Sequence, residues 1–185
     1  MKTALENMTA YAKGEMLSEE SYSIVDYIFK SFALGELKEK ICNEILGYDQ
    51  SNESIHGKDG YNNGRGVEHK TEKKPPLSGE AAWSSTKDFG KLRQLIDSDQ
   101  EYCQSGWTRK GRLIYVLSMN LNDTDIPHKI GEYISKNQYN PKPWTPKTGH
   151  KHFGNADVNL VYFNEKYADE NIFSGPFLNK IKNYG

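Results

Sequence analysis

Residues 56–72 read HGKDGYNNGRGVEHKTE, and this stretch decides the predicted fold. Its centre, Asn63-Gly64, is typical of a two-residue type I′ turn, because both turn positions need a positive φ. Taking these two residues as the turn predicts a β-hairpin with strands over about 54–61 and 66–72. The segments on either side of the hairpin can then be assigned outward from it.

The turn determines which side chains share a face of the hairpin. In this register Asp59 lies directly opposite Glu68, and opposed residues have Cβ atoms about 4.5–5.5 Å apart. Lys70 joins the same face, because side chains two apart on a strand point the same way, whereas His69 points to the other face. The hairpin therefore predicts two carboxylates and one amine side by side.

Two facing carboxylates repel each other unless a cation lies between them. Mg²⁺ meets this need, because it takes one or two protein carboxylates and keeps several waters. A metal-bound water beside Lys70 suits attack on a phosphodiester, and the metal neutralises charge in the transition state. The same three residues also suit an ordinary exposed hairpin of mixed charge, so the flanking elements matter to the interpretation.

Apolar periodicity predicts helices and strands on both sides of the hairpin. Upstream, apolar residues three and four apart predict a helix capped by Ser18 and a second helix from Glu36 to Leu46. Downstream, RLIYVLSMNL over 112–121 is almost continuously apolar, as in a central strand covered on both faces. The remaining predicted elements are a helix over 85–102, a short helix after Thr124, an irregular stretch over 138–154 and a strand over 157–163. This order predicts a single α/β domain, an α/β/α sandwich around one mixed sheet.

Composition narrows the class of protein further. The chain has 185 residues, with 24 basic and 25 acidic side chains, so its net charge neither demands nor excludes nucleic acid. Its two cysteines are too few for a disulfide framework or a structural zinc site. No stretch approaches the roughly 18 apolar residues of a membrane span, and the N-terminus has no apolar signal region. The expected protein is cytoplasmic and has no membrane partner.

The hairpin resembles the signature of the PD-(D/E)xK nuclease superfamily, whose fold most type II restriction endonucleases share. That signature is an Asp followed by Glu or Asp, one residue and Lys, and the matching residues are Asp59 and Glu68-His69-Lys70. A preceding helix that opens with Gly and carries a Glu is matched by GELKEKICNEIL, with Gly35 and Glu39. The residue before Asp59 is Lys58, where the family pattern has Pro. The resemblance extends over about 35–121.

The resemblance implies a restriction-endonuclease-like fold and Mg²⁺-dependent cleavage of double-stranded DNA by a homodimer. It implies Asp59, Glu68 and Glu39 as metal ligands and Lys70 as the catalytic lysine, with Glu36 and Glu44 as rivals of Glu39. The domain over 1–185 then divides into N-terminal helices over 1–47, the catalytic hairpin and core over 48–121 and a C-terminal recognition segment over 122–185.

A basic stretch in the last third of the chain is the predicted DNA-reading segment. No acidic residue occurs between Tyr139 and Asn155. Interleaved cations, amides and aromatics suit contacts to phosphates and base edges, and a long irregular segment is uncommon in a compact domain unless it has a function. An ordinary solvated loop is the alternative. The predicted DNA-binding residues are Arg65, Lys142, Lys147, His150, Lys151, His152, Asn155 and Asn159.

Other functions remain open at this point. His56, His69, His150 and His152 favour a ββα-metal nuclease, in which a histidine acts as general base beside one Mg²⁺. A non-catalytic DNA-binding relative of the same fold is a second alternative. A homing, repair or junction-resolving nuclease is a third.

Overall fold

A computed structural model describes residues 3–31, 35–51, 58–72, 80–170, 181 and 183–184. The helices are α1 Ala4–Lys13, α2 Glu19–Ser31, α3 Gly35–Leu46, α4 Phe89–Asp97, α5 Ile126–Asn137 and α6 Glu165–Glu170, with short 3-10 turns η1 Leu121–Asp123 and η2 His150–His152. The strands are β1 Asp49–Gln50, β2 Gly60–Asn62, β3 Arg65–Glu72, β4 Glu80–Ala82, β5 Glu101–Trp107, β6 Leu113–Asn120, β7 Lys147–Gly149 and β8 Asn159–Phe163.

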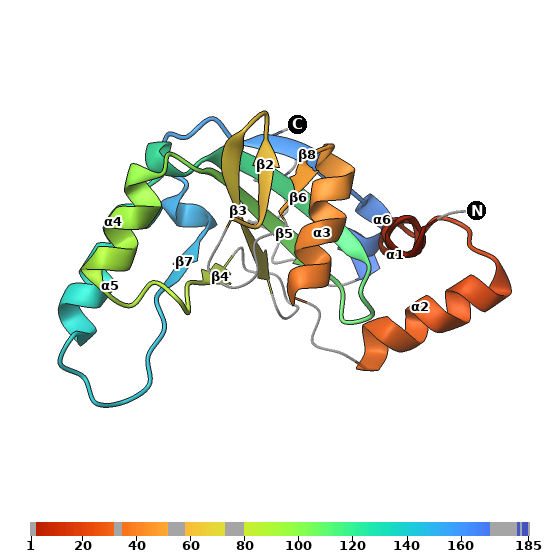
Figure 1. Ribbon diagram of the computed structural model, residues 1–185, viewed down its shortest axis with the longest axis horizontal. Helices are drawn as coiled ribbons and strands as arrows, with labels where there is room; N and C mark the ends of the chain where they lie inside the picture. The colour runs from red at the N-terminus through yellow and green to blue at the C-terminus, as the bar shows by residue number, and fades with distance from the viewer. Residues whose placement is uncertain are drawn as a thin grey trace.

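The strands form one large sheet with helices on both of its faces. Its order is β1-β2-β3-β5-β6-β8, and β4 and β7 make a separate two-stranded sheet. Figure 1 shows α1, α2 and α3 on one side of the large sheet and α4 and α5 on the other. Each side has its own apolar core, one around Ile41, Trp107 and Val116 and one around Trp83 and Ile114. The predicted mixed α/β sandwich is therefore confirmed.

The hairpin has the predicted turn and register. Asn63 and Gly64 have φ values of 50° and 83°, as a type I′ turn requires. Gly60 pairs with Val67, Tyr61 with Gly66 and Asn62 with Arg65. The first strand is shorter than predicted, because β2 begins at Gly60, and the predicted residues 54–57 lie outside the described part of the chain.

The predicted helix over 85–102 is wrong at both ends. The helix α4 covers only Phe89–Asp97, and residues 101–107 form β5, which lies parallel to β3 and antiparallel to β6. All seven residues of β5 are buried, although Glu101, Gln104 and Ser105 are polar. Their hydrogen-bond partners, Asn62, Tyr115 and Trp107 in that order, also lie within the protein. The strand therefore carries polar side chains and lacks the apolar run that marks a central strand in the sequence.

The two helices predicted upstream of the hairpin are present as α2 and α3, and a further helix, α1, precedes them. The hydroxyl of Ser18 accepts a hydrogen bond from the Ser21 N–H (3.3 Å) at the start of α2, and Gly47 has a φ of 69° after α3. The sequence interpretation missed α1. Thr3 caps that helix, and Glu6 completes a reciprocal capping box with it, a pattern recognisable in the sequence.

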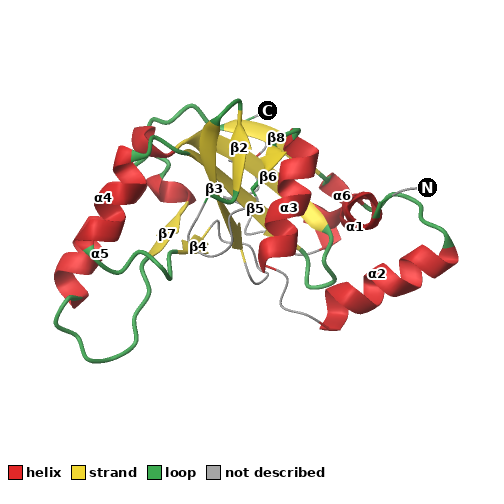
Figure 2. Cartoon of the chain, viewed as in Figure 1, coloured by secondary structure: helices red, strands yellow, loops and turns green. Residues whose placement is uncertain are grey.

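The predicted irregular stretch over 138–154 contains a strand. Residues 147–149 form β7, which pairs antiparallel with β4 and lies beside α5, as Figures 1 and 2 show. The predicted helix after Thr124 is α5, and its N-cap position is Asp125, although the Thr124 hydroxyl accepts a hydrogen bond from the Ile126 N–H (3.2 Å). Within the described ranges, no helix combines the length and the hydropathy needed to cross a bilayer.

Candidate active site

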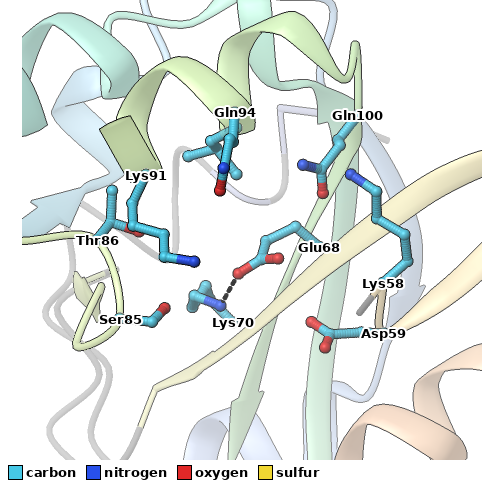
Figure 3. A pocket seen from close by; sticks show the side chains of 10 residues that line it. Lys58, Asp59, Glu68, Lys70, Ser85, Thr86, Lys91, Gln94 and Gln100 are labelled. Carbon is cyan, nitrogen blue, oxygen red and sulfur yellow. Dashed lines mark hydrogen bonds and ion pairs between the residues drawn. The ribbon is translucent and has the colours of Figure 1, made fainter. Parts of the chain in front are cut away.

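The acidic face of the hairpin opens onto a cavity of about 460 Å³, here called the hairpin cavity. Asp59, Glu68 and Lys70 all line it, so the three signature residues come together as predicted. Figure 3 shows their side chains converging from the residue before β2 and from β3. The opposite wall comes from the turn after β4, from α4 and from the residue before β5. The other lining residues are Lys58, Ser85, Thr86, Lys91, Gln94, Leu95 and Gln100.

The carboxylate of Asp59 is held by the neighbouring strand. Its Oδ2 accepts a hydrogen bond from the backbone N–H of His69 (2.7 Å), and its own N–H donates to the Val67 carbonyl (3.0 Å). Burial and the nearby Glu68 carboxylate raise the pKa of Asp59 to about 6. The raised pKa shows that burial and the neighbouring carboxylate disfavour the ionised form of Asp59, a cost that a cation between the two carboxylates would lower.

A buried asparagine in α3 positions the same segment from behind. Asn43 Nδ2 donates to the Asp59 carbonyl oxygen (2.8 Å), and Asn43 Oδ1 lies 2.6 Å from His69 Nε2. His69 is 2% exposed and faces α3, as its position on the hairpin predicted. Burial and the charge of Lys70 lower the pKa of His69 to about 3. His69 is therefore a neutral structural residue, and it is no general base in the cavity.

Lys70 supplies positive charge to the two carboxylates. Its ammonium contacts Glu68 Oε1 and donates to the His69 carbonyl (3.0 Å). It also lies 5.0 Å from the centre of the Trp83 ring. Burial lowers the pKa of Lys70, but the charges of Glu68 and Asp59 outweigh that effect and raise it. The amine is therefore a fixed cation.

Glu39 is an acidic residue of α3 whose pKa is affected by the charges of the hairpin. Burial and the charge of Asp59 raise its pKa to about 7. Its rival Glu36 is exposed, and Glu44 lines a different cavity beside α1. Glu39 itself does not line the hairpin cavity. Among the described residues, no three or more His, Cys, Asp or Glu side chains are arranged to hold a metal ion.

Two of the predicted DNA-binding residues lie around a second cavity. Arg65 and Asn159 line this turn cavity of about 440 Å³, which shares no lining residue with the hairpin cavity. Arg65 pairs with Asp99 (3.0 Å), and Glu101 lies at the same cavity. These contacts give Arg65 an acidic partner within the protein.

The other predicted DNA-binding residues belong to the segment before and after β7. That segment is anchored to the site through Trp83, whose Nε1 donates to Thr148 Oγ1 (2.9 Å) and whose N–H donates to the Pro146 carbonyl (2.9 Å). His152 Nδ1 accepts from the Gly149 N–H (2.9 Å), and burial lowers the pKa of His152. None of these predicted residues lines the hairpin cavity, namely Lys142, Lys147, His150, Lys151, His152 and Asn155.

Within the described residues, the histidines do not assemble the alternative metal site. The strands β7 and β8 belong to different sheets, so residues 147–163 form no hairpin. His69 is buried against Asn43, and His56 lies outside the described residues. The geometry therefore favours the hairpin carboxylates over a ββα arrangement.

Three residues of the site escaped the sequence interpretation. Asn43, Trp83 and Gln100 are buried polar or aromatic residues whose neighbours come from distant segments. Only the assembled fold brings Asn43 to the hairpin or Trp83 beneath Lys70. The chain matches no protein-family model, and no curated protein matches it either.

Proposed function

We propose that this protein is a Mg²⁺-dependent endonuclease that hydrolyses phosphodiester bonds in double-stranded DNA. The observation that carries the proposal is the meeting of Asp59, Glu68 and Lys70 in one open cavity. Two carboxylates beside one fixed ammonium suit a reaction at an anionic phosphate.

The donor set of the cavity fits Mg²⁺. This ion takes oxygen ligands, needs only one or two protein carboxylates and retains waters. Asp59 and Glu68 supply those carboxylates, and the raised pKa of Asp59 reflects burial and repulsion that a divalent cation relieves. Glu39 acts in this proposal through its charge near Asp59 and not as a third ligand, because it does not line the cavity. When bound, Mg²⁺ supplies an activated water and charge neutralisation.

The remaining residues of the cavity have separate roles in the proposal. Lys70 orients the attacking water and stabilises charge that develops on the phosphate, because its ammonium is held by Glu68 and the His69 carbonyl. Lys91, on the opposite wall, offers a second cation to the DNA backbone. In this proposal the phosphodiester lies between the hairpin and α4.

Plasmid nicking tests the proposal directly. The full chain should convert supercoiled plasmid to nicked and linear forms in Mg²⁺ and leave it intact in EDTA. Asp59→Asn and Glu68→Gln should abolish cleavage while DNA binding in Ca²⁺ persists, because each removes one metal ligand. Asp123→Asn, which changes a carboxylate of the turn cavity, is the matched control and should cut normally.

The same assay separates the alternatives. DNA binding without cleavage in any divalent metal identifies a non-catalytic relative. Cleavage that survives Asp59→Asn but is lost in His150→Ala or His152→Ala identifies a histidine-based nuclease. Full activity in both carboxylate variants contradicts the proposed site.

The biological form of the activity is proposed from the resemblance alone. A type II restriction enzyme acts as a homodimer and cuts both strands at one fixed sequence. Sequencing the ends of digested mixed DNA, together with sedimentation of the free protein, tests both features. Ends without a common sequence favour a repair or junction-resolving role.

A further inference from the structure

Lys58 directly precedes Asp59 and lines the hairpin cavity with it. It occupies the position of the proline in the signature that the hairpin resembles, and the proposed cleavage does not use its charge. Figure 3 shows the Lys58 side chain on the opposite side of Glu68 from Lys70. In that view the Glu68 carboxylate therefore has a lysine on either side.

A missing side chain on β3 determines where the aliphatic part of Lys58 lies. Gly66 shares the cavity face of β3 with Glu68 and Lys70, because residues two apart on a strand point the same way. A Cβ on Gly66 would lie 2.8 Å from Cδ and Cε of Lys58, which is too close for two carbon atoms. Gly66 does not have a positive φ, so its backbone does not require glycine. The glycine instead leaves room for the Lys58 side chain to lie across the strand.

The charge of Lys58 acts inside the cavity. Burial and the Glu68 carboxylate raise the pKa of Asp59, whereas the charges of Lys70 and Lys58 lower it. Lys58 is partly exposed and borders an open cavity, so a ligand in that cavity can reach its side chain. A lysine ammonium is a compact positive charge that suits a phosphate oxygen. Lys58 thus offers the cavity a cation at a distance from the one that Lys70 supplies.

We propose that Lys58 binds a DNA phosphate adjacent to the one that is cut. This inference rests on the proposed cleavage at Glu68 and Lys70, and it adds a second phosphate subsite to the same cavity. Along one DNA strand a phosphate follows about every 3.4 Å of helix axis. A strand whose cleaved phosphate lies at Glu68 therefore carries one of the two neighbouring phosphates toward the side of the cavity where Lys58 stands.

Fluorescence anisotropy measures this contact with a duplex that the wild type cuts, in Ca²⁺ instead of Mg²⁺. Lys58→Ala should weaken binding about tenfold, as the loss of one charge-assisted hydrogen bond does. It should also reduce the salt dependence of log affinity by about one unit of slope. Lys58→Arg should keep the wild-type affinity, because it restores the cation. Lys166→Ala, at an exposed lysine on α6, is the matched control and should bind as the wild type does.

Gly66→Ala provides a second variant, which displaces the lysine without removing it. The new methyl group conflicts with the Lys58 side chain, so DNA binding should weaken. In a Lys58→Ala background the same substitution should weaken binding no further, because the two changes act on one contact. Both single variants should cleave saturating DNA at the wild-type rate, since a contact made equally in the bound and transition states affects KM and not kcat. Circular dichroism checks that each variant is folded.

Duplexes that carry a single neutral methylphosphonate identify the phosphate that Lys58 binds. For the wild type, one such duplex, with the methylphosphonate beside the cut, should bind about tenfold more weakly because it lacks the charge that Lys58 contacts. Lys58→Ala should bind that duplex and the unmodified duplex equally well. Methylphosphonates at other positions should weaken the wild type and Lys58→Ala by the same factor.

Two results would overturn the inference. One is an unchanged affinity and salt dependence in Lys58→Ala. The other is a weaker Lys58→Ala that remains as sensitive as the wild type to every methylphosphonate, which would mean that Lys58 acts only through Asp59. Both results leave DNA cleavage itself intact. Absence of any Mg²⁺-dependent cleavage by the wild type instead removes the proposed function, and the second phosphate subsite with it.

Discussion

Asn43 Oδ1 and His69 Nε2 lie 2.6 Å apart in the buried layer between α3 and the hairpin. His69 also donates its backbone N–H to the Asp59 carboxylate (2.7 Å). Asn43 completes the connection, because its Nδ2 donates to the Asp59 carbonyl oxygen (2.8 Å). One amide on a helix therefore holds both the strand that carries Glu68 and the segment that carries Asp59.

Replacement of that amide should destabilise the protein. Asn43→Ala leaves the Asp59 carbonyl and the His69 ring without their buried partner, and such a loss costs about 1–3 kcal/mol. Urea unfolding measures this change in the free energy of unfolding. Asn155→Ala, at an exposed position, should stay within about 0.5 kcal/mol of the wild type. Equal stability of Asn43→Ala and the wild type would show that the connection is dispensable.

Glu39 should make stability depend on pH in the absence of metal. Its pKa of about 7 in the folded protein exceeds the usual 4.5, so the folded state holds a proton that the unfolded chain releases between these values. The free energy of unfolding contributed by Glu39 therefore falls as pH rises through this window, by at most about 1.4 kcal/mol per pH unit.

Glu39→Gln removes that dependence. The variant and the wild type should differ little near pH 4.5, and the variant should become the more stable of the two as pH approaches 7. Thermal unfolding in EDTA across this range measures the difference. Glu44→Gln, on the same helix but away from the site, is the control and should run parallel to the wild type. Parallel curves for Glu39→Gln would mean that the Glu39 carboxyl has no perturbed pKa.

Lys70 should matter more to cleavage than to folding. Lys70→Met keeps the aliphatic stem but leaves Glu68 and Asp59 to repel each other without the ammonium, so cleavage should fall by orders of magnitude. The pKa of Asp59, measured by NMR without metal, should rise further. Lys136→Met on the exposed side of α5 serves as the control. A variant that simply fails to fold would assign Lys70 a structural role.

The segment that contains β7 can be tested for DNA contact. Lys147→Ala and Lys151→Ala remove exposed charges, so they should weaken binding to all DNA alike and reduce its salt dependence. Asn155→Ala should weaken binding at the preferred sequence by about 1–3 kcal/mol if it contacts adenine. Fluorescence anisotropy at several salt concentrations separates the two effects. Unchanged affinity and salt slope in all three variants would leave the segment as an ordinary surface loop.

The hairpin was predictable because its determinants are local. Asn63-Gly64 demands positive φ at both positions, and that demand specifies the register that places Asp59 beside the strand of Glu68 and Lys70. The helix α3 was predictable for a similar reason, since its apolar spacing and the following Gly47 mark both its face and its end.

The strand β5 and the cavity wall were not predictable, because their determinants are distant. Glu101 satisfies its buried carboxylate with donors from Tyr48, Asn62 and Ser118, which come from three other segments. The residues next to Glu101 in the sequence do not indicate these partners, so the sequence of this strand looks like the end of a polar helix. Gln100 donates a hydrogen bond to its sequence neighbour Ser98, but only the fold brings Gln100 to the same cavity as Glu68.

The stacking of Lys70 over Trp83 gives the protein an intrinsic optical reporter. The indole is fully buried, lies 5.0 Å from the ammonium and is bonded through Nε1 to Thr148. Of the three tryptophans in the chain, Trp107 belongs to the core on the opposite face of the sheet. A cation that draws Glu68 away from Lys70 alters the electric field at the Trp83 ring, and its emission wavelength shifts accordingly. Occupancy of the site can thus be followed by fluorescence without any attached label.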